Sequence, residues 1–73
     1  MVLDRVTKII ADVLQVGYAD VMVDRELTAY GIDSARSMDL VIALEDAFKV
    51  EISDAIMLQF RTVNDIVRAL ENL

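Results

Sequence analysis

The sequence contains neither cysteine nor histidine, and these two absences remove most of the chemistry that a small protein could carry out alone. Without cysteine there are no disulfides and no thiolate nucleophiles, and without histidine the usual zinc sites and nucleophile–base pairs are missing. Proline is absent as well, and no internal repeat or low-complexity run marks a linker. We therefore expect residues 1–73 to form one domain that folds throughout.

Positive charge and long apolar runs are also scarce. Thirteen acidic against seven basic side chains give a net charge of −6, which repels nucleic acid and anionic lipid and favours partners with basic surfaces. The longest apolar run, residues 40–44, is too short to span a bilayer, and Asp4 and Arg5 interrupt the N-terminal segment where a secretory signal needs apolar residues. The sequence predicts a soluble, cytoplasmic monomer that binds neither nucleic acid nor membrane.

What is present is mainly aliphatic, because 56% of the residues are apolar and only 5% are aromatic. A first helix is predicted near the N-terminus by apolar residues at helical spacing, namely Val2, Val6, Ile9, Ile10, Val13 and Leu14. Gly17 follows where a left-handed helix cap is common. Residues 18–32 then lose the helical period, which indicates a long loop with a helical turn over 24–29. Val21, Val23 and Leu27 are expected to lie over the core, and Leu27 and Tyr30 to anchor the loop.

Three further helices are predicted. The second runs from Ser34 or Ala35 to Phe48 and buries one face, made of Leu40, Val41, Leu44, Ala47 and Phe48. Ser53 caps a short third helix over 54–60, and Thr62 with Asp65 forms a capping pattern before a fourth helix with an apolar face of Val63, Ile66, Val67, Leu70 and Leu73. The fold class is therefore all-α, a small four-helix bundle with three longer helices, a short third one and a long loop between the first two.

Ser34 is the residue to which the chemistry points. A helix that begins here directs unpaired N–H groups and its positive dipole end toward the serine, which suits an attached phosphate. No histidine and no lysine within five residues could activate the hydroxyl as a nucleophile, so modification is the better interpretation. A divalent metal at Asp33 and Asp39 has little support, because these residues do not follow a coordinating-loop spacing.

The second helix also carries apolar residues on the side away from its core face. Met38 and Ile42 lie there beside Glu45, and Asp39 and Asp46 flank them. Scattered apolar residues are common on protein surfaces, but this position also suits a docking site for another protein. We expect Met38, Asp39, Ile42, Glu45 and Asp46 to contact partners.

The residues around Ser34 resemble those of the acyl carrier proteins, the phosphopantetheine-binding carriers, over essentially the entire chain. The spacing of the family pattern L-x-x-x-G-x-D-S-L-x-x-x-E-L-x-x-x-L-E-x-x-F is kept by Leu27, Gly31, Asp33, Ser34, Ala35, Asp39, Leu40, Leu44, Glu45 and Phe48. Two later elements of the family, I-x-D and T-V-x-D, are matched by Ile52, Asp54, Thr62, Val63 and Asp65.

This resemblance implies a carrier without catalytic activity of its own. A phosphopantetheinyl transferase would attach 4′-phosphopantetheine from coenzyme A to Ser34, with Asp33 as part of the flanking motif. The thiol of the arm would hold an acyl or aminoacyl group as a thioester for acyl-loading and for acyl-transfer or condensing enzymes with basic docking surfaces. The methionine start favours a free-standing carrier over a segment of a larger synthase.

Three positions depart from the family pattern, and one of them, Ser53 in place of a frequent proline, matters little because serine caps a helix equally well. Ala35 replaces the usual leucine after the serine, and Arg36 places a positive charge in the first turn of the helix, where the dipole disfavours it. Arg36 either contacts phosphate or a partner carboxylate, or it is an ordinary solvated arginine. Ala35 and Arg36 are also expected among the partner contacts, and both favour a carrier in polyketide-type or other specialised biosynthesis over a standard fatty-acid carrier. The alternatives are a peptidyl or aminoacyl carrier, and an unmodified acidic helical module that binds other proteins.

Overall fold

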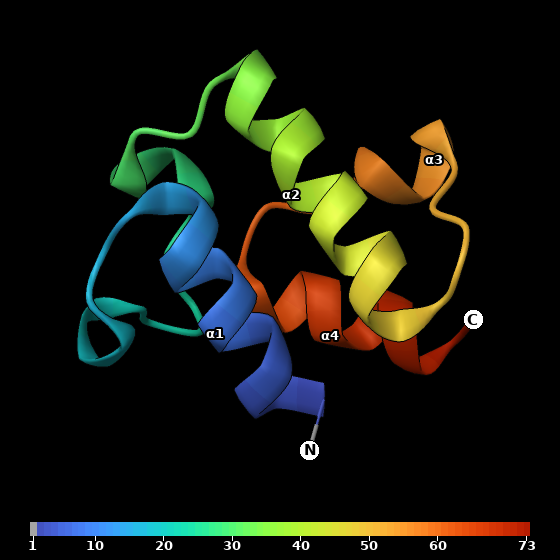
Figure 1. Ribbon diagram of the computed structural model, residues 1–73, viewed down its shortest axis with the longest axis horizontal. Coiled ribbons are helices and arrows are strands. Elements are labelled where there is room, and N and C mark those ends of the chain that lie inside the picture. The colour runs from blue at the N-terminus through green and yellow to red at the C-terminus, as the bar shows by residue number, and fades with distance from the viewer. Residues whose placement is uncertain (1) are drawn as a thin grey trace.

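The computed structural model describes residues 2–73. It contains helices α1 (Val2–Leu14), α2 (Ser34–Phe48), α3 (Asp54–Met57) and α4 (Val63–Glu71), with two short 3-10 turns, η1 (Tyr18–Asp20) and η2 (Leu27–Tyr30), between α1 and α2. In Figure 1 the start of α2 stands at one edge of the molecule, and α3 lies at the side of the bundle away from α1. The predicted all-α bundle with a short third helix is confirmed. None of the helices in residues 2–73 combines the length and apolar character that a membrane span requires.

The core forms where α1 packs against both α2 and α4. An apolar stripe on each of these helices is removed from water, which is the main favourable term in folding. The side chains of Val6, Ile10, Leu44, Val63 and Ile66 are completely buried. The rest of the buried apolar set consists of Ala11, Val21, Leu27, Leu40, Val41 and Ile52.

Helix α1 ends in a left-handed residue, but that residue is Gln15 and not Gly17. Gln15 has a φ of 56°, and the Val16 N–H donates to the Ala11 carbonyl at 3.1 Å, which closes the end of the helix as a Schellman-type cap. Gly17 has a φ of −65° and precedes η1. The prediction of a glycine cap was therefore wrong by two residues, because the helix stops at Leu14 before it reaches the glycine.

The end of α2 repeats this arrangement. Lys49 has a φ of 55°, and the N–H groups of Lys49 and Val50 both donate to the Glu45 carbonyl. Helices α1 and α2 therefore end in the same kind of C-terminal cap, and in both caps the left-handed residue is not glycine.

The long loop is fixed to the body of the protein at several points. Leu27 is buried, its N–H donates to the Arg61 carbonyl at 2.8 Å, and an antiparallel bridge joins Glu26 to Thr62. The Tyr30 hydroxyl accepts a hydrogen bond from the Met22 N–H at 2.7 Å. The predicted anchoring by Leu27 and Tyr30 is confirmed, although the predicted turn over 24–29 occurs at Leu27–Tyr30 and a further turn, η1, lies before it.

Two other expectations about apolar side chains need correction. Val23 was expected to cover the core, but its side chain is exposed, while Val21 is buried. The third helix was expected to reach Phe60, but α3 ends at Met57, and Leu58 beyond it is 79% exposed. A four-residue helix has no room for a second turn that would carry Leu58 back to the core.

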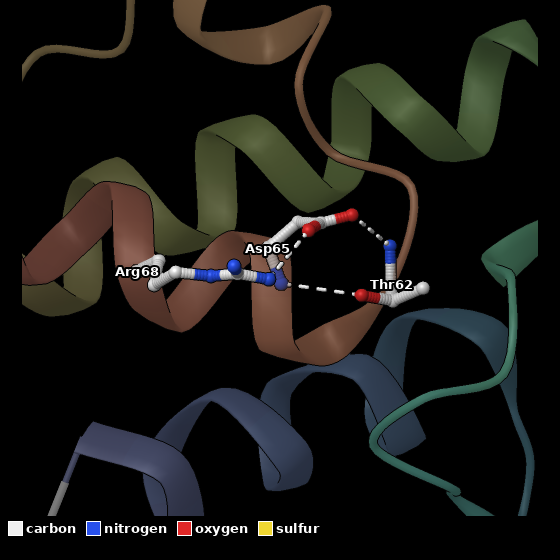
Figure 2. A network of polar contacts seen from close by, with 3 residues as sticks. All are labelled: Thr62, Asp65 and Arg68. Atoms are coloured by element: carbon white, nitrogen blue, oxygen red, sulfur yellow. Dashed lines mark hydrogen bonds and ion pairs between the residues drawn. The ribbon is translucent and has the colours of Figure 1, made fainter.

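Helix α4 begins with the predicted cap. The Thr62 hydroxyl accepts from the Asp65 N–H at 3.2 Å, and the Asp65 carboxylate accepts from the Thr62 N–H at 3.1 Å (Figure 2). The same carboxylate pairs with Arg68 one turn later, at 3.0 Å. This reciprocal capping box fixes the point at which α4 starts. The helix ends at Glu71, so Leu73, which was expected on its apolar face, lies beyond it and is exposed.

Candidate attachment site at the start of helix α2

The residues before α2 make a sharp entry into the helix. Gly31 closes η2 with a φ of 80°, a left-handed conformation that glycine adopts without steric cost. Asp33 is then extended and caps the helix, because its carboxylate accepts from the Arg36 N–H at 2.8 Å and its carbonyl accepts from the Ser37 N–H at 2.8 Å. Ser34 is consequently the first residue of α2, as the sequence predicted.

Ser34 lies where a bulky group could be attached without disturbing the core. Its side chain and that of Ala35 are exposed, and within residues 2–73 no hydrogen bond engages the Ser34 hydroxyl. The N–H groups of Ser34 and Ala35 belong to the first turn and have no acceptor inside the helix. A phosphodiester on Ser34 would meet these donors and the positive end of the helix dipole, so the site fits 4′-phosphopantetheine.

Arg36 points away from this site and toward α1. Its Nη1 donates to the Val13 carbonyl at 2.6 Å, and the side chain is half-buried. The alternative of an ordinary solvated arginine is therefore wrong, and contact of Arg36 with phosphate or with a partner carboxylate stays a prediction. In the free protein the guanidinium binds the C-terminal end of the neighbouring helix, where a positive charge is favoured by the dipole.

The exposed face of α2 combines apolar and acidic side chains. Met38 is 50% exposed and Ile42 58% exposed, and Asp39 and Asp46 are exposed beside them. Asp46 lies 3.6 Å from the Lys49 ammonium, but both side chains are so solvated that this pair adds little. The structure thus places these four predicted contact residues at the surface.

Glu45, which was also predicted to contact partners, has a role inside the fold. Its Oε2 accepts from the Ile52 N–H at 2.8 Å, and the side chain is half-buried. The carboxylate therefore fixes the segment between α2 and α3.

Within residues 2–73 there is no group of three or more acidic side chains that could hold a metal ion, and Asp33 is already used as a helix cap.

An apolar cleft that the sequence did not reveal opens one helical turn after Ser34. Its outer part, about 290 Å³, and its inner part, about 50 Å³, share the residues Leu27, Ile32, Ser37 and Phe60. The inner part is closed by Leu40, Val41 and Met57. Ser37 is half-buried at the edge of this cleft. No local sequence signal marks the cleft, because it depends on how the loop, α2 and the segment after α3 meet.

The fold and the exposed serine together define a class of protein, the small helical carrier domain. Residues 4–70 match the family of phosphopantetheine attachment sites. An acyl carrier protein of Phytoplasma mali (strain AT) is 29% identical over 72 residues, which cover 97% of this chain and 86% of that protein. An acyl carrier protein of Onion yellows phytoplasma (strain OY-M) is 34% identical over 68 residues, covering 92% of this chain and 90% of that protein.

The chain therefore belongs to the acyl carrier protein family. Proteins of this family carry covalently attached 4′-phosphopantetheine and are carriers of cargo, not catalysts.

Proposed function

We propose that Ser34 is the attachment point of 4′-phosphopantetheine and that the chain presents acyl cargo on this arm to partner enzymes. The observation that carries the proposal is the position of Ser34, an exposed hydroxyl at the first residue of α2 with unpaired N–H groups beside it. The arm supplies a thiol that holds cargo as a thioester, which this cysteine-free chain cannot supply itself.

The attachment itself is a phosphoryl transfer from coenzyme A. The Ser34 oxygen forms a bond to the phosphorus that bears the pantetheine, and the phosphoanhydride bond to the adenosine bisphosphate breaks. The bisphosphate leaves, and the hydroxyl proton passes to a base of the phosphopantetheinyl transferase or to water. The chain contributes an accessible oxygen and a helix terminus that favours the phosphate, and the transferase provides the catalysis.

Intact mass measures this attachment directly. The apo protein, incubated with a broad-specificity phosphopantetheinyl transferase and coenzyme A, should gain one phosphopantetheinyl group. Ser34→Ala should gain none, whereas Ser37→Ala, which removes a hydroxyl one turn further along α2, should gain one like the wild type. A wild type that gains no mass would favour the alternative of an unmodified acidic helical module that binds other proteins.

We also infer that the cargo is acyl and that the pathway is polyketide-type or another specialised biosynthesis. The two acyl carrier relatives support acyl over peptidyl or aminoacyl cargo, and Ala35, in place of the usual leucine, supports a dedicated set of partners. With the holo protein, loading by a malonyl transferase and loading by an aminoacyl-adenylating enzyme can be compared by mass. Efficient aminoacyl loading alone would overturn the acyl assignment.

The remaining parts of the functional interpretation concern partners and location. A net charge of −6 and the exposed Asp39 and Asp46 suit acyl-loading, acyl-transfer and condensing enzymes with basic docking surfaces. A small number of exposed apolar residues, such as Met38 and Ile42, suits a transient contact that forms and dissociates with each reaction step. Such a carrier would work as a monomer in the cytoplasm, where these enzymes and coenzyme A are found.

A further inference from the structure

Two arginines connect α1 and α2 at both ends of this antiparallel pair. Arg36, in the first turn of α2, donates from Nη1 to the Val13 carbonyl near the end of α1, at 2.6 Å. Arg5, in the first turn of α1, donates from Nη2 to the Ala47 carbonyl near the end of α2, at 2.6 Å, and its guanidinium lies 4.3 Å from the centre of the Phe48 ring. Each helix therefore receives an arginine of the other at its C-terminal end.

The carbonyls that accept these bonds are ones that the helix caps leave open. The caps at Gln15 and Lys49 satisfy the carbonyls of Ala11 and Glu45. Val13 and Ala47 lie two residues further along, among the final carbonyls that have no partner within a helix. A guanidinium at this place gains a charge-assisted hydrogen bond and a favourable interaction with the helix dipole.

The two arginine contacts differ in the apolar packing that surrounds them. At the Arg5 end, Phe48 and Val50 pack against the core cluster. At the Arg36 end, Ile32 packs against the core two residues before the helix, but within the first turn of α2 Ala35 and Met38 are exposed, and the first fully buried side chain of the helix is Leu40. Among residues 2–73, the Arg36 bond is the one side-chain hydrogen bond that ties this turn to a distant part of the chain.

We propose that Arg36 is a positioning residue for the modification of Ser34. By holding the first turn of α2 against the end of α1, it keeps the Ser34 hydroxyl and the neighbouring N–H groups in one orientation before any enzyme binds. This proposal rests on Ser34 being the attachment point. In this proposal Arg36 acts by binding the end of α1, and it contacts neither the phosphate nor coenzyme A.

The test compares Arg36→Met with Arg5→Met, a matched control that removes the same kind of bond at the opposite end of the helix pair. Methionine keeps the length of the aliphatic stem but has no donor. A partner that binds only the ordered turn loses apparent affinity in proportion to the population of that turn. Arg36→Met should therefore raise the KM for the carrier roughly tenfold in phosphopantetheinyl transfer, the order of one lost charge-assisted bond, with kcat unchanged.

Arg5→Met should keep the wild-type KM even where its melting temperature falls as much as that of Arg36→Met. Arg36→Lys, which keeps one donor on a flexible stem, should restore part of the loss. Equal KM values for the wild type, Arg36→Met and Arg5→Met would overturn the proposal, and so would an equal rise in both variants. A wild type that gains no phosphopantetheine would overturn the attachment site itself, and the positioning role with it.

Amide hydrogen exchange in the free protein separates positioning from direct contact with the transferase. The Arg36 and Ser37 N–H groups both donate to Asp33 and report on the first turn of α2. They should exchange roughly tenfold faster in Arg36→Met and at the wild-type rate in Arg5→Met. A raised KM with unchanged exchange would show that Arg36 touches the transferase, which contradicts the proposal.

Discussion

At the scale of single residues, the conformation of the backbone decides which glycine matters. Gly31 has a φ of 80° at the entry to α2, and a side chain there would meet no neighbouring atom within 4 Å. Gly17 has a φ of −65°, which any residue adopts, and an added Cβ would lie 2.8 Å from the Asp20 carboxylate, the end of a flexible exposed side chain. Only Gly31 is needed for its conformational freedom.

We expect Gly31→Ala to lower the free energy of unfolding by about 1 kcal/mol, because alanine is strained at positive φ. Gly17→Ala should change it by less than about 0.5 kcal/mol, since Asp20 can rotate away and alanine also restricts the unfolded chain. Urea unfolding followed by circular dichroism measures both values. A large loss at Gly17 with none at Gly31 would show that the left-handed position had been assigned to the wrong residue.

Burial separates two neighbouring aliphatic residues of α2 in the same way. The Leu44 side chain is 0% exposed and the Ile42 side chain 58% exposed. Leu44→Ala should lower the free energy of unfolding by about 3 kcal/mol through loss of buried area and a residual cavity. Ile42→Ala should stay within about 0.5 kcal/mol while it weakens transfer of the arm or of cargo. Thermal melts and transferase kinetics on both variants provide the comparison, and a strongly destabilised Ile42→Ala would place this residue in the core.

At the scale of elements, the sequence predicted the helix starts and the end of α2 at Phe48, but not the residues that cap the ends of α1 and α2. Starts are marked by side chains that cap locally, as Asp33, Ser53 and Thr62 do. The ends of α1 and α2 rest on Gln15 and Lys49 in a left-handed conformation, for which neither residue has a preference that a sequence could reveal.

Contacts between distant elements could not be predicted for a related reason. The Arg36 bond spans 23 residues of the chain and the Arg5 bond 42, so both depend on how α1 and α2 are packed. The position of Ser34 at the start of α2 was predictable because the residues that cap this helix are local. The hydrogen bond that Glu45 accepts from the Ile52 N–H depends on the path of the chain after α2. The residue type alone could not predict this bond.

The capping box of α4 offers a prediction at this scale. Thr62→Ala removes the acceptor of the Asp65 N–H and should lower the free energy of unfolding by about 1 kcal/mol, because a helix N-cap is lost. Thr28→Ala, an exposed threonine on η2, serves as the control and should have almost no effect. Chemical unfolding measures the free energy of unfolding of both variants. Equal stability of Thr62→Ala and the wild type would mean that the box contributes nothing to the fold.

At the scale of the whole molecule, the two sides of α2 have different surroundings. The buried side of α2 joins α1 and α4 in the core, and its other side presents Met38, Asp39, Ile42 and Asp46 to solvent below the attachment point. Because the acidic residues outnumber the basic ones, the entire chain attracts basic partners, and the exposed face of α2 would direct them to Ser34. If the net charge of the protein steers its partners, charge reversal on any helix should slow their binding equally. If the exposed face of α2 steers them, charge reversal on α2 should slow binding more.

Replacing Asp39 and Asp46 by lysine changes the net charge from −6 to −2, and replacing Asp4 and Asp12 on α1 does the same on another helix. At low salt we expect the α2 pair to slow phosphopantetheinyl transfer roughly tenfold and to flatten its dependence on ionic strength, because encounter with a basic enzyme is steered by local charge. The α1 pair should have a much smaller effect. All four positions are exposed, so both double variants should keep the wild-type far-UV circular dichroism spectrum. If both pairs slow the reaction equally, attraction depends on the net charge of the bundle, and the face of α2 is not a docking surface.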